Sequence, residues 1–181
     1  MMRGVILYGP PASGKDTVTA ALHKLNDKYQ QFRRLKAGPG RTVGYRMSTV
    51  AELAALRASG DVVWENRRYG AVYVIDQPGL RAQLQERIPV VHVGQVNAVD
   101  AVLKAFSGAR WTVVALACPR DVAVRRIVER QTGDVEERLR AWDETEAVAD
   151  ADLTIDTSKS SPDVAARLID QAVRGSRAAT R

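Results

Sequence analysis

Short apolar runs alternate along the chain with stretches whose apolar residues recur at helical spacing. Runs of about four to eight apolar residues between turn residues are typical of buried parallel strands. They predict strands at residues 5–8, 90–93, 111–117 and 153–155. The helical spacing predicts helices at residues 15–25, 96–106, 121–130, 135–148 and 162–173. Strands that alternate with helices indicate an α/β fold, with a parallel sheet flanked by helices on both faces.

The segment between residues 29 and 87 departs from this regular alternation. An extended stretch at residues 29–36 leads into a loop rich in glycine and proline at residues 36–40. A helix is expected at residues 50–58, and residues 62–64 and 71–75 favour strands. A further helix is expected at residues 80–87. These short elements separate the first core strand from the next one.

Composition narrows the class of protein. The chain has 181 residues, of which 45% are hydrophobic and 27% charged, as in one globular domain. No stretch reaches the roughly 18 apolar residues of a membrane span, so we expect no membrane partner. The chain runs almost directly into its first strand, which leaves no room for a signal peptide. The single cysteine, Cys118, fits a reduced, cytoplasmic setting.

The formal net charge of +6 is compatible with a nucleic acid or a phosphorylated small molecule as partner. No basic run is interleaved with aromatic residues in the way that single-stranded nucleic acids favour. The arginines are scattered in small groups, most of which we interpret as solvated surface. We therefore expect a small phosphorylated partner and no nucleic acid, and a protein that is a monomer or a homodimer.

A glycine-rich loop with a lysine lies between the first strand and the first helix. It fits the pattern G-x-x-x-x-G-K, and its residues are Gly9, Pro10, Pro11, Ala12, Ser13, Gly14 and Lys15. Glycines allow backbone N–H groups to converge on phosphate oxygens, the helix N-terminus favours an anion, and the lysine reaches the β- and γ-phosphates. The alternative is a simple turn with an exposed lysine. The motif in this context predicts a P-loop NTPase that binds ATP with Mg²⁺.

The residue after Lys15 is Asp16, where this motif usually has a serine or threonine. The hydroxyl that normally contacts Mg²⁺ is therefore missing. Because Mg²⁺ favours carboxylate and water oxygens, Asp16 is the candidate metal ligand. Its alternative role is charge pairing with the helix N-terminus. Thr17 offers a hydroxyl one position later, and we expect it near the α-phosphate.

The chain resembles the guanylate kinase family of P-loop nucleotide kinases beyond this loop. In that family two basic residues three apart precede a Pro/Gly-rich loop, and a tyrosine follows; Arg33, Lys36 and Tyr45 reproduce this spacing. A family Tyr-Gly pair is matched by Tyr69-Gly70. The resemblance implies that these four side chains bind the phosphate of an acceptor molecule, through charge-assisted hydrogen bonds. The alternative is a set of surface arginines and packing tyrosines.

The resemblance also implies a lid at about residues 130–138 and an acceptor-binding insert at about residues 32–73. The remaining parts, 1–31, 74–129 and 139–175, would form the core of one kinase domain spanning residues 1–181. Arg130 and Arg138 would neutralise the transferring phosphoryl group, and Arg126 is a weaker candidate. A salt-bridged helix surface is the alternative for all three. Residues 155–158 resemble the loop that contacts adenine, or else form an ordinary turn.

Guanine recognition is where the family pattern fails. The family has an Asp-x-Asp segment after a core strand, and this chain has His92, Val93 and Gly94 instead. The family glutamate falls near Trp64, with Glu65 adjacent. A site that hydrogen-bonds guanine rejects other bases, because they would leave its buried polar groups unpaired. Without those groups, this chain should not strongly prefer GMP.

A second resemblance, to ribose 1,5-bisphosphate phosphokinase, fits some of these departures. That enzyme has Gly-Lys-Asp in its phosphate loop, like Gly14-Lys15-Asp16, and lacks the guanine-reading segment. This second resemblance adds a sugar phosphate as an alternative acceptor.

From the guanylate kinase resemblance as a whole, the expected function is transfer of the γ-phosphoryl group of Mg·ATP to a phosphate of a nucleoside monophosphate. The alternatives are a sugar phosphate acceptor and a non-catalytic guanylate-kinase-like binding module.

Overall fold

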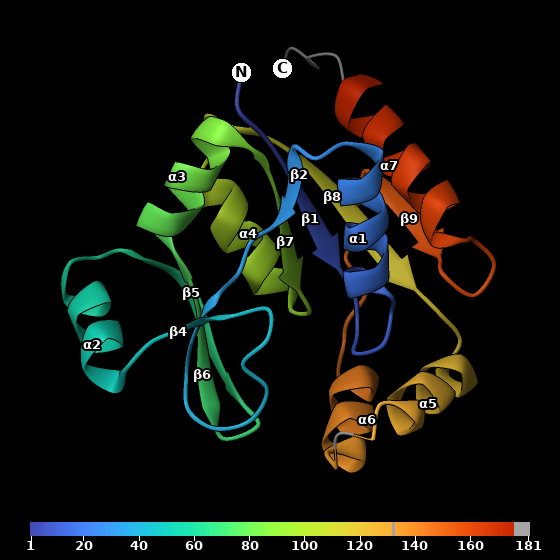
Figure 1. The fold of residues 1–181 in the computed structure, drawn as a ribbon, viewed down its shortest axis with the longest axis horizontal. Coiled ribbons are helices and arrows are strands. Elements are labelled where there is room, and N and C mark those ends of the chain that lie inside the picture. The colour runs from blue at the N-terminus through green and yellow to red at the C-terminus, as the bar shows by residue number, and fades with distance from the viewer. Residues whose placement is uncertain (132, 176–181) are drawn as a thin grey trace.

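A five-stranded parallel sheet forms the core of the computed structural model, which describes residues 1–131 and 133–175 (Figure 1). Its strands are β1 (Arg3–Tyr8), β2 (Tyr29–Gln31), β7 (Ile88–Val93), β8 (Arg110–Ala117) and β9 (Leu153–Asp156). They lie in the order β2-β7-β1-β8-β9, each parallel to its neighbours. The expected α/β fold with a parallel sheet is confirmed.

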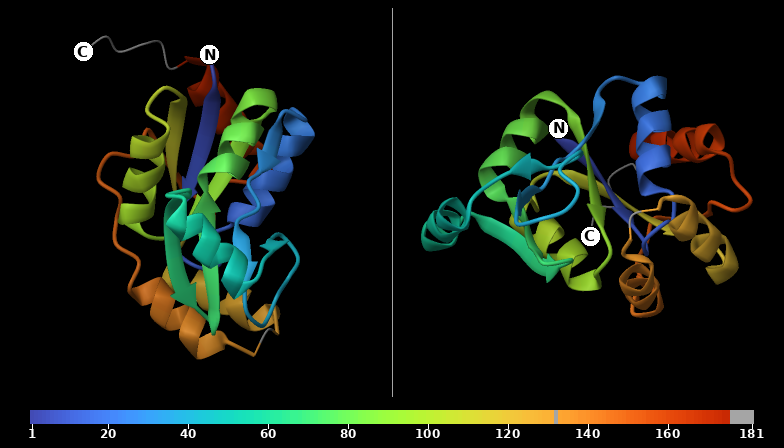
Figure 2. Two further views of the ribbon diagram at one scale, coloured as in Figure 1. Left: turned by 90° about the vertical axis from the view of Figure 1, so that its left-hand side faces the viewer. Right: turned by 60° about the horizontal axis from the view of Figure 1, so that its bottom comes forward.

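Two pairs of helices cover the two faces of this sheet, as the right-hand view of Figure 2 shows. They are α1 (Lys15–Leu25) with α7 (Pro162–Gly175), and α3 (Gln77–Glu86) with α4 (Val96–Ala105). Successive side chains of a strand point to opposite faces, so Val5 and Leu7 pack against α1 and α7. Ile6 and Tyr8 pack on the other face, with α3 and α4. Burial on both faces explains why the core strands are continuously apolar.

A second, smaller sheet stands beside the core and is formed by residues between Leu35 and Asp76. Its strands are β3 (Leu35–Ala37), β4 (Arg46–Met47), β5 (Val62–Arg68) and β6 (Ala71–Asp76), in the order β4-β3-β6-β5. Helix α2 (Val50–Ala58) begins at a capping box of Thr49 and Glu52 and buries Leu53 against the sheet. In Figure 1 this unit lies on one side of the carboxyl end of β1.

The helices α5 (Arg120–Glu129) and α6 (Val135–Asp143) lie across from the second sheet, at the same end of the core (Figure 1). They connect β8 to β9. The expected lid, at about residues 130–138, joins them and includes Thr132, which lies outside the described residues. Within the residues that the structure describes, no helix is both long and apolar enough to cross a membrane.

Several expected boundaries were wrong. The extended stretch 29–36 is two strands in different sheets, β2 and β3, and the strand expected at residues 62–64 continues to Arg68 as β5. Helix α3 begins at Gln77, because the Asp76 carboxylate caps it by accepting a hydrogen bond from Gly79 N–H. Helix α6 ends at Asp143, five residues before the expected end.

Candidate active site

The loop between β1 and α1 has the backbone conformation of a phosphate cradle. Gly9, Ala12 and Gly14 have φ angles of 155°, 62° and 95°. A Cβ atom at Gly9 would lie 2.4 Å from the Leu116 carbonyl oxygen and 2.7 Å from Ser13 Oγ. Only glycine therefore fits at the start of the loop. Helix α1 begins directly afterwards, so its positive end faces the same space.

The Lys15 ammonium group is folded over this loop. It donates hydrogen bonds to the carbonyl oxygens of Gly9 (2.6 Å) and Pro10 (2.8 Å) and to Ser13 Oγ (3.3 Å). Burial lowers the pKa of Lys15 to about 7, with Asp16 opposing the shift and Arg34 adding to it. A phosphate beside this ammonium group would favour its charged form.

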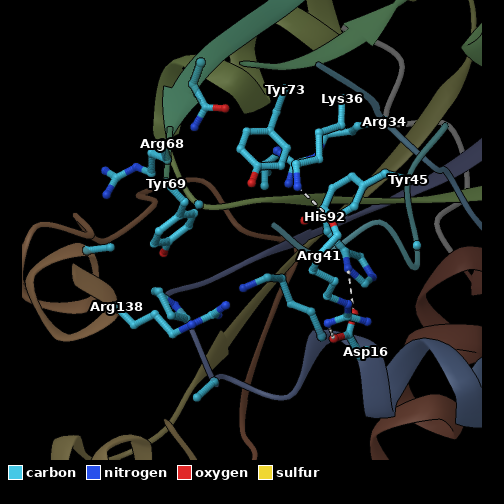
Figure 3. Close-up of a pocket in the computed structure, with 18 of the residues that line it drawn as sticks. Asp16, Arg34, Lys36, Arg41, Tyr45, Arg68, Tyr69, Tyr73, His92 and Arg138 are labelled. Carbon is cyan, nitrogen blue, oxygen red and sulfur yellow. Dashed lines mark hydrogen bonds and ion pairs between the residues drawn. The ribbon is translucent and has the colours of Figure 1, made fainter. Parts of the chain in front are cut away.

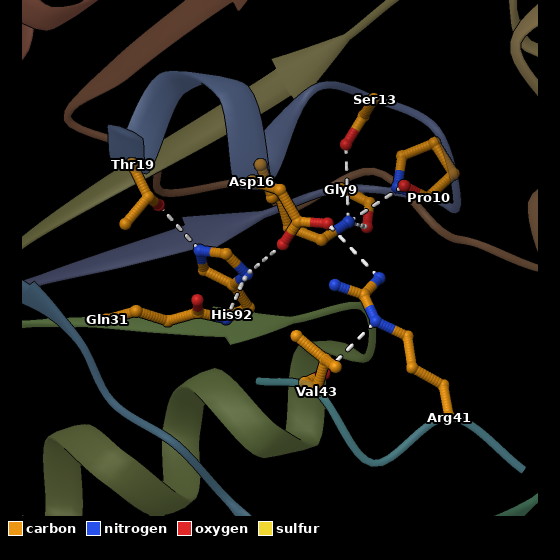
Figure 4. A network of polar contacts seen from close by, with 10 residues as sticks. Gly9, Pro10, Ser13, Asp16, Thr19, Gln31, Arg41, Val43 and His92 are labelled. Atoms are coloured by element: carbon orange, nitrogen blue, oxygen red, sulfur yellow. Dashed lines mark hydrogen bonds and ion pairs between the residues drawn. The ribbon is translucent and has the colours of Figure 1, made fainter. Parts of the chain in front are cut away.

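Asp16 sits at the mouth of the loop, between an imidazole and a guanidinium group (Figure 4). Its Oδ1 lies 3.5 Å from His92 Nδ1, and its Oδ2 lies 3.8 Å from an Nη atom of Arg41. His92 Nε2 is 2.7 Å from Thr19 Oγ1, and Nδ1 is 3.4 Å from Gln31 Nε2. Burial lowers the pKa of His92 to about 3, so the imidazole is neutral at pH 7.

The number of carboxylates near the phosphate loop indicates which metal ion the site can bind. Among the described residues no group of three or more His, Cys, Asp or Glu side chains could enclose a metal ion. Mg²⁺ is usually held by one or two carboxylates together with substrate phosphates and water. Asp16 beside the phosphate loop supplies such a carboxylate, since it is half exposed and lines the pocket. The donor set therefore fits Mg²⁺ bound with a nucleotide.

A cavity of about 390 Å³ extends from this loop toward the second sheet and α6 (Figure 3). Cationic side chains from all three parts of the molecule line it: Lys15, Arg34, Lys36, Arg41, Arg68, Arg130 and Arg138. The carboxylates among the described lining residues are those of Asp16 and Asp134. Such an excess of positive charge favours a ligand with several phosphate groups.

On the side of the second sheet, two cations lie against two tyrosine rings. The Arg34 guanidinium group is 5.3 Å from the centre of the Tyr73 ring and 5.9 Å from that of Tyr45. Lys36 Nζ lies 5.6 Å from each ring and donates a 2.7 Å hydrogen bond to the Arg41 carbonyl oxygen. Burial lowers the pKa of Lys36 and raises that of Tyr73 to about 12.

The expected residue Arg33 is not part of this group. It is exposed and does not line the cavity, whereas its neighbour Arg34 does. Side chains on one face of a strand are two residues apart, so Arg34 is in phase with Lys36 on β3, and Arg33 is not. Arg34 directly precedes β3, and this strand of three residues is too short to show the period of two in the sequence. Tyr73, which is also absent from the expected set, is the direct cross-strand partner of Lys36.

The expected lid residue Arg138 and the expected acceptor residue Tyr69 meet in the structure. The Arg138 guanidinium group lies 5.3 Å from the centre of the Tyr69 ring, and its Nε donates a 2.6 Å hydrogen bond to Asp134. The Tyr69 N–H donates to Glu137 Oε1 at 3.1 Å. Arg130, from the end of α5, is exposed and lines the same cavity. The turn at Tyr69 and helix α6 thus meet at the edge of one pocket.

Arg126 has a different location from the other arginine candidates. It does not line the cavity, but donates hydrogen bonds to the carbonyl oxygens of Ala12 (3.1 Å) and Thr157 (2.9 Å) and to Thr157 Oγ1 (3.0 Å). Thr157 Oγ1 donates to the Ser13 carbonyl oxygen at 3.0 Å. The loop at residues 155–158 is therefore fastened to the phosphate loop. Thr17 is exposed on α1 and does not line the cavity.

The positions considered for guanine recognition have other partners. Trp64 packs against the core, and Glu65 pairs with Arg57 of α2 at 2.8 Å. Asn66, two residues beyond Trp64 on the same face of β5, lines the cavity instead. Its buried Oδ1 has no hydrogen-bond partner among the described residues. The cavity is thus lined there by a neutral amide.

No family model and no curated protein matches the chain. Among solved structures it is similar to the guanylate kinase from Anaplasma phagocytophilum, with a TM-score of 0.62 at 11% identity over 99% of this chain and 90% of that one. It is also similar to the protein designated APE1195, with a TM-score of 0.59 at 15% identity over 97% and 98% of the two chains. At these identities the likeness concerns the fold. The chain therefore has a guanylate-kinase-like fold.

Proposed function

We propose that the protein is an ATP-dependent phosphotransferase that uses a phosphate group as acceptor. The observation that carries this proposal is the single cavity in which the Gly9–Lys15 loop meets cations from a second sheet and from α5–α6. The γ-phosphoryl group would leave ATP and bond to a phosphate oxygen of the acceptor, which gives ADP and a diphosphate. Such a reaction needs positioning and charge neutralisation more than covalent chemistry by the protein.

The donor side would be held by the phosphate loop. Lys15 would bind the β- and γ-phosphates, and Arg130 and Arg138 would lie against the transferring group. Asp16 would hold the Mg²⁺ ion, which supplies charge neutralisation at the phosphate oxygens when it is bound. Contact between Arg138 and Tyr69 supports a pocket that encloses the reactants and excludes water.

The acceptor phosphate would bind to Arg34, Lys36, Tyr45 and Tyr69, with Tyr73 behind them. A nucleoside monophosphate is the first candidate acceptor. The second is a sugar bisphosphate such as ribose 1,5-bisphosphate. Gln31, Asn66 and His92, which line this cavity, include no carboxylate with which to read guanine, and this favours the second candidate over GMP.

The acceptor class is tested by measuring ADP formation from Mg·ATP with each candidate in turn. GMP, dGMP, the other nucleoside monophosphates and ribose 1,5-bisphosphate form the panel. Turnover of one member supports the proposal. Binding of ATP without turnover of any member would instead support a non-catalytic binding module. Strong selectivity for GMP would contradict the interpretation of the missing guanine contacts.

Lys15→Ala should abolish turnover while the protein stays folded. We expect at least about a hundredfold loss of kcat with the best acceptor, because a preorganised charge on the transferring group is removed. The matched control is Lys24→Ala, which removes an exposed lysine from the same helix. Steady-state kinetics and circular dichroism of both variants check this prediction. Full activity of Lys15→Ala would refute the mechanism.

A further inference from the structure

The position after Lys15 and the end of β7 carry an unusual pair of side chains, a carboxylate and an imidazole. Asp16 Oδ1 and His92 Nδ1 face each other at 3.5 Å, and the other imidazole nitrogen lies 2.7 Å from Thr19 Oγ1 (Figure 4). Asp16 and Thr19 are three residues apart on α1, so they lie on the same face of the helix. The imidazole of His92 is therefore held between two side chains of one helical turn.

Within this group His92 and Thr19 are buried, whereas the Asp16 side chain is half exposed and free to take other rotamers. His92 and Thr19 are 8% and 6% exposed, whereas the Asp16 side chain is 49% exposed and opens into the cavity. Arg41 faces the other Asp16 oxygen, but that ion pair is half exposed at both ends and contributes little stability. The buried imidazole is thus the contact that limits where the Asp16 carboxylate can point.

The neighbours of the His92 ring differ at its two nitrogens: Nε2 faces the Thr19 hydroxyl, and Nδ1 faces the Asp16 carboxylate. The Thr19 hydroxyl can donate to Nε2, which leaves the hydrogen on Nδ1, directed at the Asp16 carboxylate. A hydrogen bond to a carboxylate is stronger than one between neutral groups. The Gln31 amide lies with Nε2 at 3.4 Å from Nδ1, so a hydrogen on Nδ1 requires that amide to turn and present its oxygen.

We propose that His92, oriented by Thr19, is a positioning residue that holds the Asp16 carboxylate in place as the ligand for the nucleotide-bound metal ion. The proposal rests on the proposed function, in which Asp16 holds the metal. It explains how a loop that lacks the usual hydroxyl after its lysine can still hold Mg²⁺. Here a carboxylate takes the place of the usual hydroxyl as metal ligand. The Asp16 side chain is half exposed in the first turn of α1, so it needs a buried partner to limit its rotamers.

The tautomer of His92 is a direct test that needs no turnover. The chain has two histidines, so the ¹⁵N ring resonances can be assigned with His92→Asn alone. We expect the hydrogen of His92 on Nδ1 in the wild-type protein, where it is directed at the Asp16 carboxylate. A ring hydrogen on Nε2 in the wild-type protein would overturn the proposal.

Metal affinity is the second test, with Mn²⁺ as a visible substitute for Mg²⁺. Electron paramagnetic resonance would measure Mn²⁺ binding to the protein loaded with a non-hydrolysable ATP analogue. Removal of a partner that orients a metal ligand typically weakens binding about 10–100-fold, and we expect such a loss for His92→Leu and Thr19→Val. Thr19→Ser keeps the hydroxyl, and His92→Asn places an amide nitrogen near the position of Nδ1, so both should retain most of the affinity.

The two controls separate positioning from packing. Thr19→Val fills the same space as threonine, so weak Mn²⁺ binding by it and not by Thr19→Ser identifies the hydroxyl as the cause. Unchanged Mn²⁺ affinity in both His92→Leu and Thr19→Val would overturn the proposal. These measurements involve no acceptor, so failure to find phosphotransfer in the acceptor panel is a separate result.

Discussion

At the scale of single residues, strand periodicity determines which cations reach the candidate acceptor site. Arg33 and Arg34 are adjacent in the sequence, but only Arg34 is in phase with Lys36 and faces Tyr45 and Tyr73. Arg33 is exposed, and its carbonyl oxygen accepts a hydrogen bond from Arg46 Nε at 2.7 Å. The different positions of the two arginines can be tested by replacing each of them in turn with alanine.

Arg34→Ala should raise the KM for the acceptor about 10–100-fold, because a charge-assisted contact with its phosphate is lost. The KM for ATP should change much less. Arg33→Ala removes the same charge one residue away and should leave both constants within about twofold. Steady-state kinetics on both variants shows which of the two arginines contacts the acceptor. A larger effect of Arg33→Ala would restore the assignment from motif spacing.

At the scale of secondary-structure elements, helix α5 is the support that fixes the phosphate loop to the end of β9. Arg126 bonds to Ala12 of the loop and to Thr157 after β9, and Thr157 also bonds to Ser13. These contacts satisfy carbonyl oxygens in two irregular segments, which have no strand or helix partners to do so. Arg126 is thus assigned to positioning instead of direct contact with the transferring group.

Arg126→Ala should lower the free energy of unfolding by about 1–3 kcal/mol, because three hydrogen bonds to partly buried carbonyl and hydroxyl oxygens are lost. Arg125→Ala is the matched control on the same helix. Its ion pair with Asp121 is largely exposed, so its loss should cost well under about 1 kcal/mol. Urea denaturation of both variants checks the difference. Equal stabilities would show that Arg126 does not act as a brace.

At the scale of the whole molecule, two separate parts of the chain close the cavity. The turn between β5 and β6 contacts α6 through the Tyr69 N–H and Glu137, and Arg68 at the end of β5 pairs with Glu144, just after α6, at 3.4 Å. Arg138 also lies over the Tyr69 ring. Because these contacts are few and both hydrogen bonds among them are exposed, we expect closure that is reversible and coupled to ligand binding.

Glu137→Ala should loosen this closure. The Tyr69 amide loses its acceptor, so we expect its hydrogen exchange to become about three- to tenfold faster. Glu136→Ala removes a neighbouring carboxylate from the same first turn of α6, and so controls for the interaction with the helix dipole. Hydrogen exchange followed by mass spectrometry on both variants is the measurement. Identical exchange at Tyr69 would argue against the contact.

Much of the fold and the donor side could be predicted from the sequence because the signals there are local. Buried parallel strands are continuous apolar runs, and a phosphate loop requires its glycines and lysine within seven residues of one strand end. Each expected core strand is present within about two residues of its expected place, whereas α3 and α6 differ from their expected bounds by three and five residues at one end. The acceptor side was harder, since β3 has three residues and β4 has two, too few for a clear period.

What the sequence by itself determined is the α/β core, the glycine-rich loop with Lys15, and the departure at Asp16. The tertiary structure alone decided that Arg34 lies beside Tyr73, that Arg126 braces the phosphate loop, and that Asp16 meets His92. The reason is that these pairs join residues far apart in the sequence. Their contacts depend on sheet order and register, which side-chain type and spacing do not encode.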